Sequence, residues 1–221
     1  MTLQKLGDIL KAEGLVSPTG TLAIPTRRRT PNSTPMLPPL TDMANQLNVD
    51  LGHTFANLDS QWPGIKPLIS AVRGVLAGKR PMACFYGGVG NGKTHLLEAC
   101  SIELYLAGKF ARVVQFAGLL STLKSCIGNP EKDFDVILTR YKYAERLILD
   151  DVGAAGSDSE FGDRILEDII CARHGRQLLT LMTTNRDIQT LPERVLSRLQ
   201  DKSFCYLVCN RAADYRPKLC A

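Results

Sequence analysis

Residues 82–98 read MACFYGGVGNGKTHLLE, and this stretch decides the fold of the 221-residue chain. It begins with an apolar run, residues 82–86, that is typical of a strand. A glycine-rich turn follows at residues 87–92, and KTHLLEACSIEL then begins a predicted helix, residues 93–107. A strand, a glycine-rich turn and a helix in this order form the context in which phosphate-binding loops are found.

The turn matches the pattern GxxxxGK[ST] at Gly87, Gly92, Lys93 and Thr94. Glycines let backbone amides approach phosphate oxygens closely, and the N-terminus of the next helix adds a partial positive charge. We therefore predict a site for ATP in which Lys93 reaches the β and γ phosphates and Thr94 binds Mg²⁺. The predicted nucleotide-binding residues are Gly87, Gly88, Val89, Gly90, Asn91, Gly92, Lys93, Thr94 and His95.

A second apolar run, in RLILDDVG at residues 146–153, ends in two adjacent acids. In parallel sheets, ligands bind in the crevice at the carboxyl ends of the strands, which is where these acids would lie. We expect Asp150 to complete the Mg²⁺ site and Asp151 to orient or deprotonate the attacking water.

Two later segments supply further polar residues. LLTLMTTN, residues 178–185, predicts a strand whose tip carries Asn185, which could bind the γ-phosphate or the attacking water. LPERVLSRLQD, residues 191–201, predicts a helix bearing Arg198, an arginine suited to stabilising charge on a transferring phosphoryl group. Arg194, on the same helix, is a competing candidate. A guanine-specific NKxD motif is absent from the sequence, which disfavours a GTPase.

Short apolar runs alternate with longer amphipathic segments from about residue 53 onward, which predicts a parallel sheet wrapped by helices. The expected fold class is α/β, a three-layer P-loop NTPase sandwich with a five-stranded parallel sheet. The expected strands are residues 82–86, 112–116, 146–149, 178–183 and 204–208. The expected helices are residues 65–76, 93–107, 119–127, 134–143, 161–173 and 192–199.

Residues 1–50 have a different composition. A short helix is expected at residues 3–13, and the stretch after it, residues 17–42, is rich in proline and contains Arg27–Arg29. Proline removes amide donors and interrupts periodic structure, so residues 1–50 are predicted to be a flexible arm. Alternatively, this arm could bind a partner or contact DNA. Residues 51–221 are predicted to form the ATPase domain.

Bulk properties exclude some classes of protein. The net charge of +5 permits contact with nucleic acid without requiring it. Seven cysteines are present, but the number is odd and no CxxC pair occurs, so no zinc site is expected. Neither a long apolar run nor a secretion signal is found, so no membrane association and a cytoplasmic location are expected.

The ordered set GGVGNGKTHLL, LILDDVG, LMTTN and RVLSRL resembles the AAA+ superfamily, in particular its DnaC/IstB-like branch of helicase loaders and transposition helper ATPases. HTFANLD, residues 53–59, is similar to a family segment that lies near the nucleotide base. The resemblance implies a homo-oligomer in which Arg198 completes the neighbour's ATP site, with single-stranded DNA contacting residues 116–127. Only about a dozen residues follow the last expected strand, so no helical lid is expected, although Arg216 could act as a sensor arginine.

The resemblance leaves three functions open. The leading interpretation is an ATP-hydrolysing loader of a replicative DNA helicase, acting on single-stranded DNA. One alternative is an IstB-like transposition helper ATPase that binds duplex DNA and regulates a transposase. The other alternative is a noncatalytic adaptor that switches with ATP.

Overall fold

The computed structural model describes residues 40–129, 132–153 and 160–215. The helix expected at residues 3–13, the arginines at 27–29 and Arg216 lie outside these ranges. Within them, no helix is both long and apolar enough to cross a membrane.

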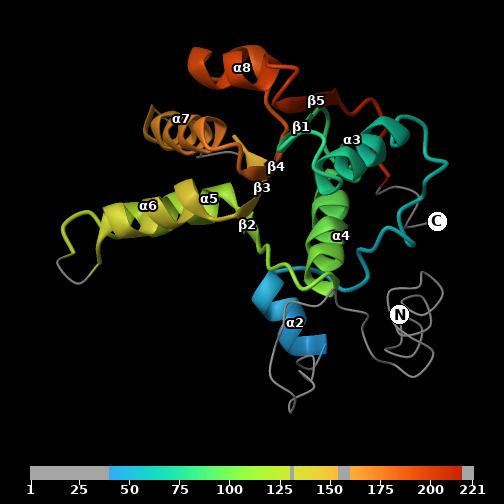
Figure 1. The fold of residues 1–221 in the computed structure, drawn as a ribbon, viewed down its shortest axis with the longest axis horizontal. Coiled ribbons are helices and arrows are strands. Elements are labelled where there is room, and N and C mark those ends of the chain that lie inside the picture. The colour runs from blue at the N-terminus through green and yellow to red at the C-terminus, as the bar shows by residue number, and fades with distance from the viewer. Residues whose placement is uncertain (1–39, 130–131, 154–159, 216–221) are drawn as a thin grey trace.

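A five-stranded sheet with the strand order β2-β3-β4-β1-β5 forms the centre of the molecule, and all paired strands run parallel (Figure 1). The strands are β1 (Met82–Tyr86), β2 (Val113–Gln115), β3 (Arg146–Val152), β4 (Leu179–Thr184) and β5 (Cys205–Cys209). Because β4 lies between β1 and β3, its tip separates the glycine-rich turn from the two acids. The predicted five-stranded parallel sheet is confirmed.

Helices cover both faces of this sheet, giving the three layers predicted from the sequence. They are α2 (Leu40–Leu47), α3 (Lys66–Leu76), α4 (Lys93–Leu106), α5 (Phe116–Lys124), α6 (Phe134–Tyr143), α7 (Glu160–Gly175) and α8 (Glu193–Gln200), with a short 3₁₀ helix, η1 (Ile188–Thr190). Helices α3 and α4 pack on one face, and α5, α6, α7 and α8 pack on the other (Figure 1).

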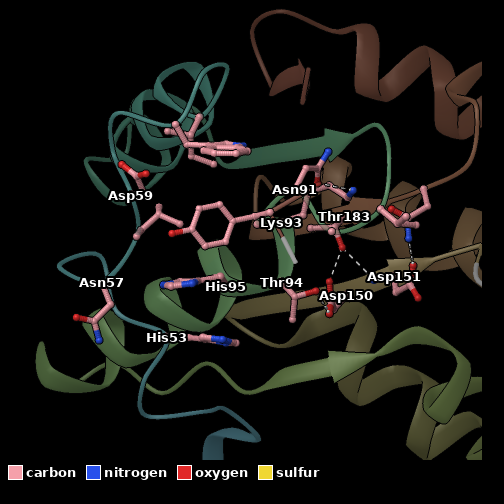
Figure 2. A pocket seen from close by; sticks show the side chains of 18 of the residues that line it. His53, Asn57, Asp59, Asn91, Lys93, Thr94, His95, Asp150, Asp151 and Thr183 are labelled. Atoms are coloured by element: carbon pink, nitrogen blue, oxygen red, sulfur yellow. Dashed lines mark hydrogen bonds between the residues drawn. The ribbon is translucent and has the colours of Figure 1, made fainter. Parts of the chain in front are cut away.

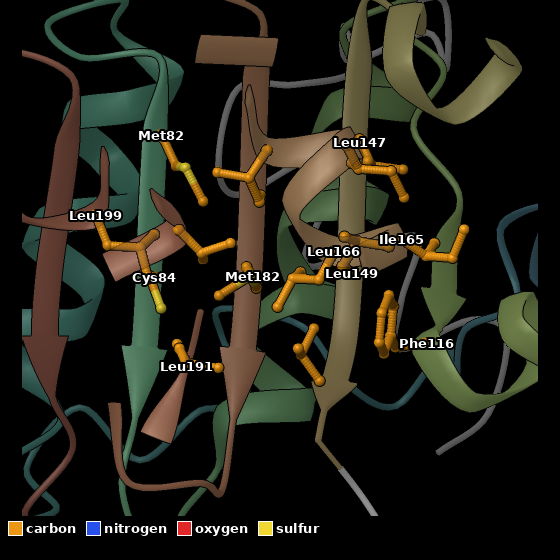
Figure 3. Packing of buried hydrophobic residues seen from close by; sticks show 14 of the residues in the cluster. Met82, Cys84, Phe116, Leu147, Leu149, Ile165, Leu166, Met182, Leu191 and Leu199 are labelled. Atoms are coloured by element: carbon orange, nitrogen blue, oxygen red, sulfur yellow. The ribbon is translucent and has the colours of Figure 1, made fainter. Parts of the chain in front are cut away.

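Alternate residues of each strand supply the two cores, as the period of a strand requires. Met82 and Cys84 of β1 point into the core beneath α5 to α8, whereas Ala83 and Phe85 point into the core beneath α3 and α4. Figure 3 shows the first of these cores, in which Met182 of β4 packs with its neighbours. The apolar runs that predicted strands are therefore apolar because both of their faces are buried.

A buried cation joins three elements near the start of β4. Arg173, in the last turn of α7, is 0% exposed and donates to the carbonyls of Ala144 at 2.8 Å and Leu179 at 2.6 Å. It also donates to the carbonyl of Tyr141 and the hydroxyl of Thr180. Burial lowers the pKa of Arg173 to about 10, so the guanidinium stays charged at neutral pH.

The bounds of most elements differ from those expected by one to three residues, and two differences concern how the chain is organised. Helix α2 lies in the stretch assigned to the arm, and its Met43 and Leu47 are buried, so folded structure extends N-terminal to residue 50. Asn48 holds this region in place by donating to the carbonyl of Val113 at 3.1 Å. Helix α5 begins at Phe116 rather than at residue 119, because Phe116 turns into the core directly after β2.

Candidate functional site

A cavity of about 680 Å³ opens at the carboxyl ends of β1, β3 and β4. Its wall includes residues of the glycine-rich turn, the predicted acids, Asn185, a segment that precedes α3, and Tyr215 in the segment after β5. Figure 2 shows Asp150 and Asp151 at one end and Asn57 and Asp59 at the other, with Lys93 and Thr94 between them. The volume is within the range of ligand sites in proteins.

The glycine-rich turn is held in shape by the segment that follows β5. Gly87 has a φ of +133°, and a Cβ there would lie 2.4 Å from the carbonyl oxygen of Asn210, so only glycine fits. Asn210 donates through its backbone amide to Tyr86 O at 2.7 Å and through Nδ2 to Asn91 O at 2.8 Å. The side chain of Asn91 donates back to Asn210 O. The loop is therefore bound to the edge of the sheet at both ends.

Lys93 lies at the start of α4 with its ammonium directed back into the loop. Nζ donates to the carbonyls of Gly87 at 2.9 Å and Gly88 at 2.5 Å and to Asn91 Oδ1 at 3.0 Å. The side chain of Lys93 is buried, and the residue lines the cavity. The structure thus places a buried cation beside the backbone amides that begin α4, an arrangement suited to phosphate oxygens.

Thr94 and Asp150 are adjacent, as a shared metal site requires. Thr94 Oγ1 donates to Asp150 Oδ2 at 2.9 Å, which joins the first turn of α4 to β3. Gln115, the last residue of β2, donates to the same carboxylate oxygen at 2.9 Å. Mg²⁺ is commonly bound by oxygen ligands from one or two carboxylates together with substrate phosphates, so this donor set fits Mg²⁺.

Thr183, in β4, contacts both acids of β3. Its hydroxyl donates to Asp150 Oδ1 at 2.5 Å and accepts a hydrogen bond from the backbone amide of Asp151 at 2.9 Å. Thr183 is 1% exposed; its hydrogen bond to Asp150 is buried, and the one from the Asp151 amide is partly buried. One hydroxyl therefore orients the carboxylate of Asp150 and the backbone of Asp151.

Asp151 has a φ of +53° and lies where the register of β3 and β4 shifts. This conformation is uncommon for a residue with a side chain. The next two polar residues of the β4 tip hold it: Asn185 Nδ2 donates to Asp151 Oδ1 at 2.7 Å, and the Thr184 hydroxyl donates to Val152 O at 2.6 Å. Strained backbone at functional sites persists where its surroundings over-determine it, as these contacts do.

The opposite end of the cavity is apolar and aromatic. Leu58, Ile65, Trp62 and Tyr215 line it. The rings of Trp62 and Tyr215 meet edge to face with centroids 4.9 Å apart, and Trp62 Nε1 donates to Ala213 O at 3.3 Å. One end of the cavity therefore carries Asp150 and Asp151, and the other, although it also has Asn57 and Asp59, offers aromatic surface suited to a flat apolar group.

Two histidines line the cavity next to Thr94. The rings of His53 and His95 stack with centroids 4.4 Å apart, as Figure 2 shows. His53 Nδ1 lies 2.8 Å from Glu98 Oε2, and this hydrogen bond raises the pKa of His53 although burial opposes it. His95 Nε2 lies 2.9 Å from the carbonyl of Thr54, so Nε2 carries the hydrogen, and burial lowers the pKa of His95.

The predicted site residues are not all in one place. Lys93, Thr94, Asp150, Asp151 and Asn185 line the cavity with the loop residues Val89, Gly90, Asn91, Gly92 and the adjacent His95. Arg198 does not line it. Its Nη1 donates to Arg194 O at 3.0 Å, and its buried Nε has no partner within the described part of the chain. Arg194 is paired with Glu167 at 2.9 Å.

Several cavity residues were not predicted from the sequence. Gln115 and Thr183 act on Asp150, and Trp62 and Tyr215 form the apolar end. Phe55 belongs to the segment, residues 53–59, that is similar to a family segment near the nucleotide base. Arg73 Cζ lies over its ring, 4.6 Å from the ring centroid, while Leu58 of the same segment lines the cavity. The available signal for Gln115 and Thr183 was a polar residue at or near the end of each strand that flanks β3.

Comparisons with known proteins agree with the fold. The family model for the ATPase family associated with various cellular activities (AAA) matches residues 83–207, more than half of the chain. The replicative helicase loader DnaC of Escherichia coli strain K12 is 27% identical over 130 residues, 57% of this chain and 53% of DnaC. DnaC of Buchnera aphidicola is 30% identical over 140 residues, 61% of this chain and 56% of DnaC. The chain spans about half the length of these curated relatives.

Solved structures share the fold. A crystal structure of the DnaC helicase loader has a TM-score of 0.62 at 21% identity and covers 73% of this chain and 98% of that chain. A crystal structure of DnaI has a TM-score of 0.59 at 25% identity, and the match covers 75% of this chain and 92% of that chain. AMPPCP-bound DnaA from Aquifex aeolicus has a TM-score of 0.61 at 19% identity, and the match covers 72% of this chain and 51% of that chain. Because the family match extends over the sheet that carries the phosphate-binding loop and both acids, the chain belongs to the AAA family of ATPases and is DnaC-like within it.

Proposed function

We propose that this protein binds ATP with Mg²⁺, hydrolyses it and acts in DNA replication as a loader of a replicative helicase on single-stranded DNA. The observation that carries the proposal is the convergence of three groups on one cavity. These are the phosphate-binding loop with Lys93, the Thr94 and Asp150 pair, and the Asp151 and Asn185 pair. The relatives named as replicative helicase loaders support the cellular role.

The polarity of the cavity supports one orientation of the nucleotide. The triphosphate lies over the loop, with its γ-phosphate toward Asp151 and Asn185. The base lies at the apolar end, against Trp62 and Tyr215, because a flat aromatic ring gains most from burial beside aromatic side chains. An ATP-sized ligand would then occupy the cavity from end to end.

Each polar residue has a separate role in the proposed hydrolysis. Lys93 neutralises phosphate charge, and Thr94 and Asp150 hold Mg²⁺, which when bound stabilises negative charge on the phosphate oxygens. Asp151 accepts a proton from the attacking water or orients it, and Asn185 donates its amide hydrogens to Asp151 and to the water or γ-phosphate. The hydrogen bond from Asn185 orients this carboxylate, which projects from a left-handed backbone at Asp151.

Nucleotide binding can be measured through Trp62, the single tryptophan of the chain. ATP should change its fluorescence, whereas tripolyphosphate should compete for the loop without this change. Lys93→Ala should bind ATP far more weakly and hydrolyse none, while Lys109→Ala, which removes an exposed lysine just after α4, should behave as wild type. Unchanged hydrolysis by Lys93→Ala would refute the proposed site.

The loader role rests on the relatives and has its own test. The exposed side of α5, with Ser121, Thr122 and Lys124, is the proposed contact for single-stranded DNA. Capture of partners from the native host with ATP present should recover a hexameric helicase. Recovery of a transposase, with preference for duplex over single-stranded DNA, would instead support the transposition helper.

Subunit sharing is proposed from the position of Arg198. It does not line its own cavity, and its guanidinium takes part in no ion pair among the described residues. Arg198→Ala should therefore keep its affinity for ATP and lose hydrolysis, by a factor of about 10³ or more if it acts as an arginine finger. Mixing it with Lys93→Ala should restore activity, since mixed interfaces would contain one intact site. Absence of rescue at every ratio would contradict sharing.

A further inference from the structure

Arg186 directly follows Asn185 and continues the contacts of the β4 tip. Its aliphatic stem lies against Gly153, the second residue after Asp151. Gly153 has a φ of +84°, and a Cβ there would lie 1.9 Å from Arg186 Cδ. The arginine stem therefore fills the space that a side chain at 153 would need, and it packs directly on the backbone that follows the acids.

The guanidinium of Arg186 is fixed by acceptors from two other elements. Nη1 donates to Asp163 Oδ1 at 2.8 Å, in the first turn of α7. Nε donates to Thr190 Oγ1 at 3.2 Å, and Nη2 donates to Thr190 O at 2.7 Å, at the end of η1. The side chain of Arg186 is only 16% exposed. Three donors from one planar group leave it little freedom.

These contacts extend a set of side-chain hydrogen bonds between the ends of β3 and β4. Thr183 binds Asp150 and Asp151, Thr184 binds Val152, and Asn185 binds Asp151. Arg186 adds Gly153 to this series and ties the same point to α7. Arg186 therefore connects Gly153, just after the acids, with helix α7, which begins at Glu160.

We propose that Arg186 is a positioning residue for hydrolysis, which holds Gly153 against the β4 tip so that Asp151 keeps its left-handed backbone beside Asn185. The inference rests on the proposed function, since it concerns the geometry of the proposed base. Arg186 itself does not line the cavity, so it acts through Asp151 and does not contact nucleotide in this subunit. Displacing a catalytic group by about 1 Å can cost about 100-fold in rate.

Arg186→Met tests this inference because it keeps most of the stem on Gly153 and removes the guanidinium. We expect kcat to fall by about 10- to 100-fold, with the Kd for ATP, read from Trp62 fluorescence, within about twofold of wild type. Arg186→Lys, which can keep the ion pair with Asp163, should recover part of kcat. Arg164→Met is the matched control, because it breaks an exposed arginine–carboxylate pair on α7 and should leave kcat unchanged.

The outcomes separate the inference from the proposed function. Wild-type kcat in Arg186→Met would overturn the inference while leaving ATP hydrolysis established, and absence of hydrolysis in the unmutated protein would overturn the proposed function first. If Arg186 had a purely structural role, Arg186→Met would have a lower melting temperature but a normal kcat per nucleotide-bound molecule. That result would also overturn the inference. If Arg186→Met does not fold, Asp163→Asn decides: a lower kcat at unchanged Kd supports the inference, and an unchanged kcat refutes it.

Discussion

Replacing Thr183 with valine would remove one hydroxyl from the centre of the site while keeping the shape of the side chain. Valine is β-branched like threonine, so the strand preference and packing of β4 should change little. The hydroxyl donates to the carboxylate of Asp150 and accepts from the amide of Asp151, and Thr183 is 1% exposed. The loss therefore comes from a buried hydrogen bond to a charged group and a partly buried one from a backbone amide.

The expected magnitude follows from those two bonds. A hydrogen bond to a charged group contributes about 1.5–3 kcal/mol, and a buried amide left without an acceptor costs about 1–3 kcal/mol. Because Asp151 is only half buried, we expect the lower end, a loss of about 3 kcal/mol in the free energy of unfolding. For a chain of this size, that corresponds to a melting temperature lower by about 6–12 °C.

Urea unfolding and thermal melting of Thr183→Val and Thr183→Ser measure this loss without nucleotide. The serine variant keeps the hydroxyl and should lose much less stability than the valine variant. The valine variant should also hydrolyse ATP more slowly, since both acids lose a contact that orients them. A loss below about 0.5 kcal/mol, or equal losses in the two variants, would refute the reasoning from these hydrogen bonds.

Three other changes test separate features. Arg173→Met should lower the free energy of unfolding by about 3 kcal/mol or more in urea titrations, because buried carbonyls lose their donors; an unchanged midpoint would contradict this. Gly87→Ala should weaken ATP binding measured by calorimetry, because its Cβ would collide with Asn210 O; wild-type affinity would refute the close packing. Protonated His53 should stabilise the fold, because its pKa is raised above 6.5. His53→Gln should therefore lower the free energy of unfolding most below pH 6.5, and by progressively less as the pH rises above 6.5. If the loss of stability in His53→Gln grew with pH in thermal melts, it would contradict this prediction.

Several predicted site residues line one cavity because each lies near a strand end or a helix start, whereas Arg198, in the last turn of α8, lies outside that cavity. In a parallel sheet such positions meet at one edge, so Lys93, Asp150 and Asn185 could be brought together without knowing any contact. The strand order confirms the reasoning for Asn185, since β4 separates β1 from β3. The catalytic roles of these residues remain predictions.

Contacts that depend on register or on the path of the chain could not be predicted. Thr183 acts on both acids because the pairing of β3 and β4 is irregular at their ends, which no local pattern reveals. Trp62 and Tyr215 meet only because the segment after β5 crosses the phosphate-binding loop. Helix α2 had a weak signal, since Met43 and Leu47 are four residues apart and both are buried.

The charges around the cavity bear on the proposal that a second subunit completes the site. Among the described residues, Lys93 is the one lysine or arginine in the cavity wall, and it faces the same end as Asp150 and Asp151. A triphosphate brings several negative charges to that end, and Mg²⁺ with one lysine would neutralise only part of them. Charge that spreads over the transferring phosphoryl group during hydrolysis would need a further cation. Because Arg198 is charged, takes part in no ion pair in the described ranges and lies outside its own cavity, a neighbouring copy is the arrangement in which it could supply that charge.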